Sequence, residues 1–228
     1  MTQQDIKLIA FDLDGTLLDS VPDLAVAADL AVQALGFAPV SETQVRDYVG
    51  NGADVLIGRA LSQDMTIDPE LSDTLRGEAR ALFDQYYQQG GHQRSHLYPA
   101  VKETLAELQQ GGFTMALVTN KPSKFVPEIL KQHGIEHYFV DVLGGDAFAE
   151  KKPNPVALNW LMDKHGVKAG ELLMVGDSKN DILAAKNAGC RSFGLTYGYN
   201  HGEPIAASAP DFVADSIADL VGVVAVSA

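Results

Sequence analysis

Two aspartates that directly follow a short apolar run constrain the fold more than any other feature of the chain. Leu8 to Phe11 has no polar alternation, as in a strand buried on both faces of a parallel sheet. Asp12 and Asp14 stand two residues apart, so in an extended chain both side chains project to the same side. Open α/β sheets bind ligands at the edge where the carboxyl ends of their strands lie. A divalent cation there would relieve the repulsion between the two carboxylates. A polar turn at Gly15 explains these few residues equally well.

Strand and helix patterns alternate regularly from residue 98 onward. Apolar runs predict strands over 113–118, 139–143, 172–175 and 192–195. The helices predicted between them begin at Pro99, Ser123, Asn154 and Ile182, and each ends before a glycine, at positions 111, 134, 166 and 189. Short turns between strand and helix favour right-handed crossovers. The pattern therefore predicts an α/β fold with a doubly wound, Rossmann-like parallel sheet.

The segment between the first strand and this alternating region has a different composition. Helical patterns cover 22–35, 42–48, 53–61 and 69–89, and no strand pattern is visible there. Such a change is typical of a domain boundary. We therefore expect an all-helical cap domain over residues 17–95, inserted into a core domain made of residues 1–16 and 96–228.

The charge balance limits the partners of the chain. The 17 Lys and Arg residues against 30 Asp and Glu residues give a net charge of -13, which disfavours binding to nucleic acid or to an anionic membrane. The single cysteine, Cys190, suits a reducing compartment. The apolar runs before Asp12 and over Leu220 to Val226 are too short for a signal-peptide core or a membrane span. We expect a cytoplasmic protein that is a monomer or a weak homo-oligomer.

Polar residues suited to phosphate chemistry stand after several predicted strands. They form the runs Val118-Thr119-Asn120-Lys121, Lys151-Lys152-Pro153 and Gly176-Asp177-Ser178-Lys179-Asn180-Asp181. Each run alone has an ordinary explanation as a turn, a solvated lysine pair or a helix cap. The carboxyl ends of parallel strands meet at one sheet edge, so together these runs predict a phosphate site there.

This ensemble resembles the haloacid dehalogenase-like hydrolase superfamily over nearly the whole chain. The matching motifs are Asp12-x-Asp14-Gly15-Thr16, Thr119, Lys152 and Gly176-Asp177-x-x-x-Asp181, with the helical insertion in the place of that superfamily's cap. Within it, the runs Gly50-Asn51-Gly52-Ala53, Lys151-Lys152-Pro153 and Gly194 to Asn200 resemble the bacterial phosphoglycolate phosphatases. The resemblance implies a magnesium-dependent phosphatase for a small phosphorylated metabolite, with 2-phosphoglycolate expected as the substrate.

The resemblance also implies a role for each motif residue. Asp12 would attack phosphorus, and Asp14 would protonate the leaving oxygen and later activate water. Thr119, the N–H groups around Asn120, and Lys152 would stabilise the phosphoryl group. Mg²⁺ would bind the Asp12 carboxylate, the Asp14 carbonyl and Asp177, with Asp181 behind them orienting a water or Lys152. Further residues expected to contact the substrate are Thr16, Asn51 and Gly52, and, as a further cap residue, Arg59.

Other functions fit the same sequence. A phosphatase for a sugar phosphate or another small metabolite would share these motifs, and so would a phosphomutase. A phospho-accepting receiver module also gathers acids, a Thr and a Lys around one aspartate, but such modules are shorter and have no helical insertion after the first strand. We therefore expect a hydrolase, with these alternatives open.

Overall fold

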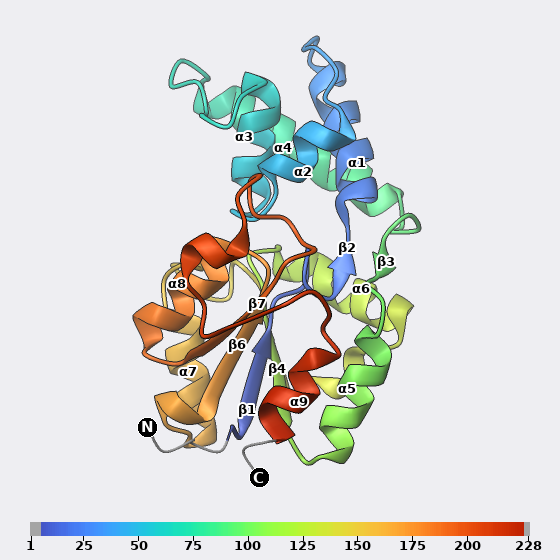
Figure 1. Ribbon diagram of the computed structural model, residues 1–228. Coiled ribbons are helices and arrows are strands. Elements are labelled where there is room, and N and C mark those ends of the chain that lie inside the picture. The colour runs from blue at the N-terminus through green and yellow to red at the C-terminus, as the bar shows by residue number, and fades with distance from the viewer. Residues whose placement is uncertain (1–5, 226–228) are drawn as a thin grey trace.

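A computed structural model describes residues 6–225 and shows a parallel sheet with helices on both faces (Figure 1). Six strands form the sheet in the order β5-β4-β1-β6-β7-β8, and every neighbouring pair is parallel. They are β1 (Leu8–Phe11), β4 (Thr114–Val118), β5 (Asp141–Leu143), β6 (Leu172–Gly176), β7 (Arg191–Leu195) and β8 (Phe212–Ala214). This topology confirms the predicted doubly wound sheet, with β1 between β4 and β6 in the middle.

Helices cover the sheet because its strands are apolar on both faces. They are α5 (Val101–Gln110), α6 (Val126–His133), α7 (Val156–His165), α8 (Lys179–Ala188) and α9 (Asp219–Ala225), with the short 3-10 helices η1 (Ser123–Phe125), η2 (Glu136–Tyr138), η3 (Ala169–Glu171) and η4 (Ile205–Ser208). Alternate residues of β1 serve different layers: Leu8 and Ala10 belong to a core with α7 and α8, whereas Ile9 and Phe11 belong to a core with α5, α6 and α9 (Figure 1).

Four further helices pack on one another above the carboxyl edge of the sheet (Figure 1). They are α1 (Val21–Ala34), α2 (Glu42–Tyr48), α3 (Ala53–Ser62) and α4 (Asp73–Gln89). The last begins later than its sequence pattern suggests because Ser72 accepts a hydrogen bond from the Leu75 N–H and caps the helix there. The helices agree with the expected insertion. That residues 17–95 form a domain of their own stays a prediction.

The expectation that residues 17–95 contain no strand is wrong. β2 (Leu18–Asp19) pairs antiparallel with β3 (His96–Leu97), so the chain enters and leaves the helical part through two adjacent extended segments. Strands of two residues are too short to show alternation, and the sequence pattern misses them for that reason. The sixth strand of the sheet, β8, was also not expected, and its three residues at the sheet edge give a similarly weak signal.

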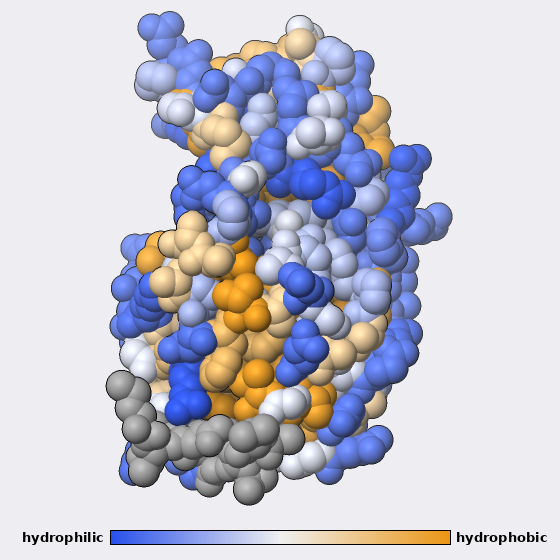
Figure 2. Space-filling view, viewed as in Figure 1, coloured by the Kyte–Doolittle hydropathy of each residue, from blue (hydrophilic) through white to orange (hydrophobic). Residues whose placement is uncertain are grey.

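The molecule narrows on one side between the four helices and the sheet, and hydrophilic residues cover most of the visible face (Figure 2). Among the described helices, none has the length and apolar character needed to cross a membrane. Residues 1–5 and 226–228 of the expected core, including Val226 of the C-terminal apolar run, lie outside the described residues.

Candidate active site

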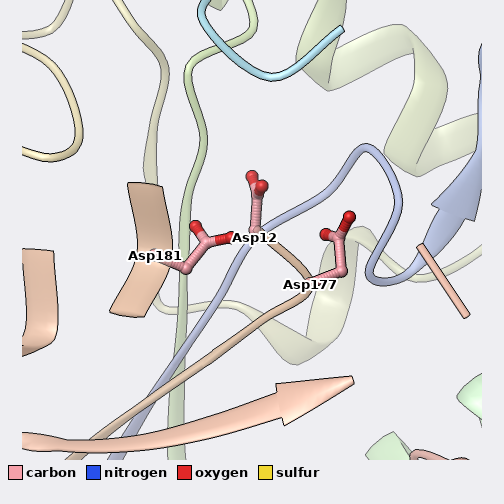
Figure 3. Close-up of side chains that lie close together, drawn as sticks. All are labelled: Asp12, Asp177 and Asp181. Carbon is pink, nitrogen blue, oxygen red and sulfur yellow. The ribbon is translucent and has the colours of Figure 1, made fainter. Parts of the chain in front are cut away.

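Asp12 lies at the end of the central strand β1, with its carboxylate next to those of Asp177 and Asp181 (Figure 3). Its backbone N–H donates to the carbonyl of Val175 at 3.0 Å, which continues the pairing between β1 and β6. Its Oδ1 accepts from the Leu13 N–H at 2.7 Å and lies 2.9 Å from the Lys152 ammonium. The carboxylate is therefore held at the sheet edge.

Lys152 is fixed by three acceptors. Its Nζ donates to the Val118 carbonyl and to Asp181 Oδ1, each at 2.7 Å, and lies 2.9 Å from Asp12 Oδ1. Because an ammonium group has three N–H donors, these partners occupy all of them. Asp181 is fully buried, and its Oδ2 accepts from the backbone N–H and the hydroxyl of Ser178. Of the two partners expected for Asp181, the geometry therefore favours Lys152.

Several carboxylates lie close together and buried at this edge of the sheet, and this shifts the pKa values of the groups there. Burial, with Asp181 adding to it and Lys152 opposing it, raises the pKa of Asp12 to about 7. Burial beside Asp181 and Asp12 raises the pKa of Asp177 well above its ordinary value. Burial alone would lower the pKa of Lys152, but Asp12 and Asp181 outweigh it and the pKa of Lys152 is raised. Two buried lysines, at 121 and 152, face four aspartates here, so the site accommodates further positive charge.

Oxygen atoms suited to a hard divalent cation lie within this cluster. Carboxylate oxygens of Asp12, Asp177 and Asp181 lie within 4.8 Å of one another (Figure 3). Asp181 Oδ1 contacts the Lys152 ammonium and its Oδ2 accepts two hydrogen bonds from Ser178, whereas Asp177 has only uncharged partners, Thr16 and Tyr199, among the described residues. Over residues 6–225, no N–H group donates to the backbone carbonyl of Asp14. An all-oxygen set made of Asp12, Asp177 and that carbonyl fits Mg²⁺.

Asp177 sits in a tight pocket. Its Oδ1 accepts from the Thr16 hydroxyl and its Oδ2 from the Tyr199 N–H, both at 2.6 Å. A Cβ atom at Gly15 or at Gly198 would lie 2.2 Å from Asp177 Oδ2, and Gly15 has φ of +87°. The structure thus places the Thr16 hydroxyl on Asp177 and not on the cavity. Its expected contact with substrate stays a prediction, while its observed contact orients a carboxylate.

We expect Gly198→Ala to weaken Mg²⁺ binding by about 10- to 100-fold, because the added methyl group displaces the Asp177 carboxylate. Calorimetric titration of the metal-free protein with Mg²⁺ measures this directly. Gly77→Ala, in a helix where an added Cβ meets nothing within 4 Å, is the matched control. Unchanged Mg²⁺ affinity in Gly198→Ala would remove Asp177 from the metal site.

Asp14 has a partner that the sequence motifs did not indicate. The Lys121 ammonium donates to Asp14 Oδ1 at 3.0 Å and Oδ2 at 3.2 Å, and also lies 4.8 Å from the centre of the Tyr87 ring on α4. Lys121 is only 4% exposed. The available signal was its spacing, since it follows Thr119 by two residues just as Asp14 follows Asp12.

A cavity lies between this edge and the four helices. The sheet side contributes Asp12, Asp14, Thr119, Asn120, Lys121, Pro122 and Phe125, and the helical side contributes Leu24, Val49, Gly50, Gly52, Ala53, Leu56, Phe83 and Tyr87. In the described part of the chain, the backbone N–H groups of Asp14 and Asn120 have no acceptor. Two unused donors at the ends of neighbouring strands suit phosphoryl oxygens.

Two asparagines join the sheet edge to the helical part. The side-chain amides of Asn120 and Asn180 both donate to the Gly50 carbonyl, at 3.0 and 3.1 Å. Asn120 also donates to the Lys152 carbonyl at 3.0 Å. Its amide nitrogen therefore holds the loop before α3 over the cavity, and its backbone N–H is the donor left for a ligand.

The residues expected to contact substrate from the helical part are only partly brought to the cavity. Gly52 lines it, whereas Asn51 does not. Arg59 donates to the carbonyls of Tyr48 and Met65 and also lies outside the lining. Which face of a helix or turn looks into the cavity depends on how α1 to α4 pack, and single-residue patterns do not show that.

Comparison with known proteins gives one consistent result. The family model for haloacid dehalogenase-like hydrolases matches residues 9–195. A phosphoglycolate phosphatase of Vibrio parahaemolyticus is 82% identical over 228 residues, which is 100% of both chains. One from Vibrio cholerae is 72% identical over 99% of this chain and 100% of its own. A crystal structure of a predicted phosphoglycolate phosphatase from Haemophilus somnus has a TM-score of 0.89 at 44% identity, covering 98% of this chain and 99% of the other.

Proposed function

The chain belongs to the haloacid dehalogenase-like hydrolase family, and from that premise we propose that it is a phosphatase that hydrolyses 2-phosphoglycolate to glycolate and phosphate. The observation that carries the reaction class is the pair Asp12 and Asp14 on one side of the cavity, each held by its own buried lysine. The full-length similarity to phosphoglycolate phosphatases supports the substrate.

The proposed reaction has two steps on the same aspartate. An Asp12 oxygen attacks phosphorus, the bond to the ester oxygen breaks, and Asp14 gives that oxygen a proton, which leaves an aspartyl phosphate and glycolate. Asp14 then takes a proton from water as the water attacks the aspartyl phosphate, which restores Asp12 and releases phosphate. Both carboxylates line the cavity, so both can reach a bound ester.

Other residues at the edge of the sheet would stabilise the negative charge of the phosphoryl group and of Asp12. Thr119 and the free N–H groups of Asp14 and Asn120 would receive the phosphoryl oxygens. Lys152 would offset negative charge on Asp12 and on the transferring group, held in place by Asp181. Asp12, Asp177 and the Asp14 carbonyl would hold Mg²⁺, which when bound supplies charge stabilisation to the phosphoryl group.

The helical part would enclose the substrate as a cap. We propose that residues 17–95 act as one domain hinged at β2 and β3, closed by the hydrogen bonds of Asn120 and Asn180 to Gly50. Closure excludes bulk water from the first step. The chain's acidity and its single buried Cys190 support a cytoplasmic enzyme acting on a free metabolite, as a monomer or weak homo-oligomer.

We expect phosphate release from 2-phosphoglycolate to exceed release from sugar phosphates and other small monoesters by at least about 10-fold in kcat/KM, and to stop when a chelator removes Mg²⁺. The assay is phosphate release across a substrate panel with Mg²⁺, with chelator, and with Mg²⁺ restored. Equal rates on all monoesters would contradict the proposed substrate. Full activity in chelator would contradict the metal, and transfer of phosphate within a sugar would indicate a mutase.

A further inference from the structure

Lys121 supplies a positive charge whose one role in the proposed phosphoryl chemistry is to hold Asp14. Lys152 already serves Asp12, and the phosphoryl oxygens have backbone donors. Lys121 lines the cavity on the sheet side, and its buried ammonium donates to both oxygens of Asp14. With three N–H groups and two Asp14 oxygens, it has one N–H left for another acceptor.

The rest of the cavity lining makes Lys121 distinctive. Among the described lining residues, the helices α1 to α4 and the loops between them contribute glycines and apolar side chains, and Tyr87 is the exception. The tyrosine hydroxyl is buried and interacts with the Lys121 ammonium. Lys121 is the one cationic side chain among the described lining residues. A sugar with many hydroxyl groups would find few partners on this wall.

The Tyr87 ring is held firmly beside that ammonium. It stacks on Phe83 with ring centres 5.6 Å apart and meets the edge of Phe125 at 5.0 Å. The Lys121 nitrogen lies 4.8 Å from the centre of the same ring. Burial raises the pKa of Tyr87 to about 12, so its hydroxyl remains a donor at neutral pH. An ammonium and a hydroxyl donor are thus fixed side by side at the cavity wall.

The position of the Lys121 ammonium and the Tyr87 hydroxyl relative to Asp14 indicates which part of the substrate they bind. Asp14 must reach the ester oxygen of the substrate within about 3 Å to give it a proton. In 2-phosphoglycolate one methylene group separates that oxygen from the carboxylate, which therefore lies next to Asp14. Lys121 contacts both oxygens of Asp14, so its ammonium is within reach of that carboxylate. An unpaired anion beside Asp14 would otherwise be repelled.

We propose that Lys121, assisted by the Tyr87 hydroxyl, binds the carboxylate of the substrate's leaving group and so selects 2-phosphoglycolate over phosphate monoesters whose leaving group is uncharged. This inference rests on the proposed function. It assigns substrate specificity to Lys121, a residue at the edge of the sheet. The helical cap contributes an apolar wall and the Tyr87 hydroxyl.

The test compares 2-phosphoglycolate with its carboxamide analogue, in which a neutral amide replaces the carboxylate at nearly the same size. In the wild-type enzyme we expect kcat/KM to favour the carboxylate, and in Lys121→Met we expect this ratio to fall by about 10- to 100-fold. Lys121→Arg keeps the charge and should keep part of the preference. Lys124→Met, an exposed lysine paired with Asp84, is the control and should leave the ratio unchanged.

Each outcome is informative. If Lys121→Met slows both substrates by the same factor, Lys121 acts through Asp14 alone and the inference is overturned. If the wild-type enzyme hydrolyses both esters equally well, the inference fails while the phosphatase stands. If it hydrolyses neither, the proposed function fails as well.

A second variant covers the case in which Lys121→Met does not fold. Tyr87→Phe removes a single hydroxyl and keeps the ring that packs against Phe83 and Phe125. It should leave the fold intact and lower the carboxylate preference by at least about 3-fold. An unchanged ratio in Tyr87→Phe would overturn the inference without any use of the lysine variant.

Discussion

Asp12→Asn is expected to lower phosphate release from 2-phosphoglycolate by at least about 10⁴-fold while the protein remains folded. Asn has nearly the same shape, but its amide cannot attack phosphorus and form the aspartyl phosphate. Burial and the neighbouring aspartates already disfavour the charge at this position, as the pKa of about 7 shows. Without Mg²⁺, the variant should therefore unfold at a temperature no lower than the wild type. Steady-state phosphate release and thermal unfolding measure the two effects.

Asp163→Asn, on the exposed face of α7, is the matched control and should retain full activity. Acid quenching during turnover adds a direct readout: wild-type protein should carry acid-stable phosphate on the peptide that contains Asp12, and the variant should carry none. Phosphate release by Asp12→Asn at the wild-type rate would show that Asp12 is not the nucleophile.

The sheet and its ligand edge could be predicted because their signals are local. A strand buried on both faces reads as an apolar run, and the change to polar residues marks its end. The polar residues after three of these strands, Asp12, Thr119 and Asp177, therefore fall on one edge whatever their contacts. Helix caps are equally local, and α2, capped by Ser41, begins and ends where its pattern predicts.

The contacts within the site could not be predicted because they are long-range. Lys121 and Asp14 are 107 positions apart, and Thr16 and Asp177 are 161 positions apart. Both pairs join side chains that follow different strands, so spacing along a single strand indicates the side on which a residue lies and not the residue that it contacts. The close approach of Gly198 to Asp177 depends on the path of the loop after β7, for which periodicity gives no information.

Asp14→Asn is expected to lower kcat/KM for 2-phosphoglycolate by about 10²- to 10⁴-fold, because no proton reaches the leaving alkoxide. The loss should depend on the leaving group. Acetyl phosphate is similarly small and releases acetate, which needs no proton, so attack by Asp12 should remain fast in this variant. Hydrolysis of the aspartyl phosphate also needs Asp14 as a base and should remain slow.

Asp14→Asn should therefore release acetate in a burst that equals the enzyme concentration, followed by slow turnover, as phosphoenzyme accumulates. Rapid-quench measurement of acetate and of protein-bound phosphate tests this, with Asp163→Asn as the control that gives wild-type kinetics. Equal losses on both substrates with no burst would show that Asp14 serves the attack of Asp12 itself. Since Asp14 also accepts hydrogen bonds from Lys121 through its side chain, and its carbonyl is a proposed metal ligand, only the leaving-group dependence separates proton transfer from those two roles.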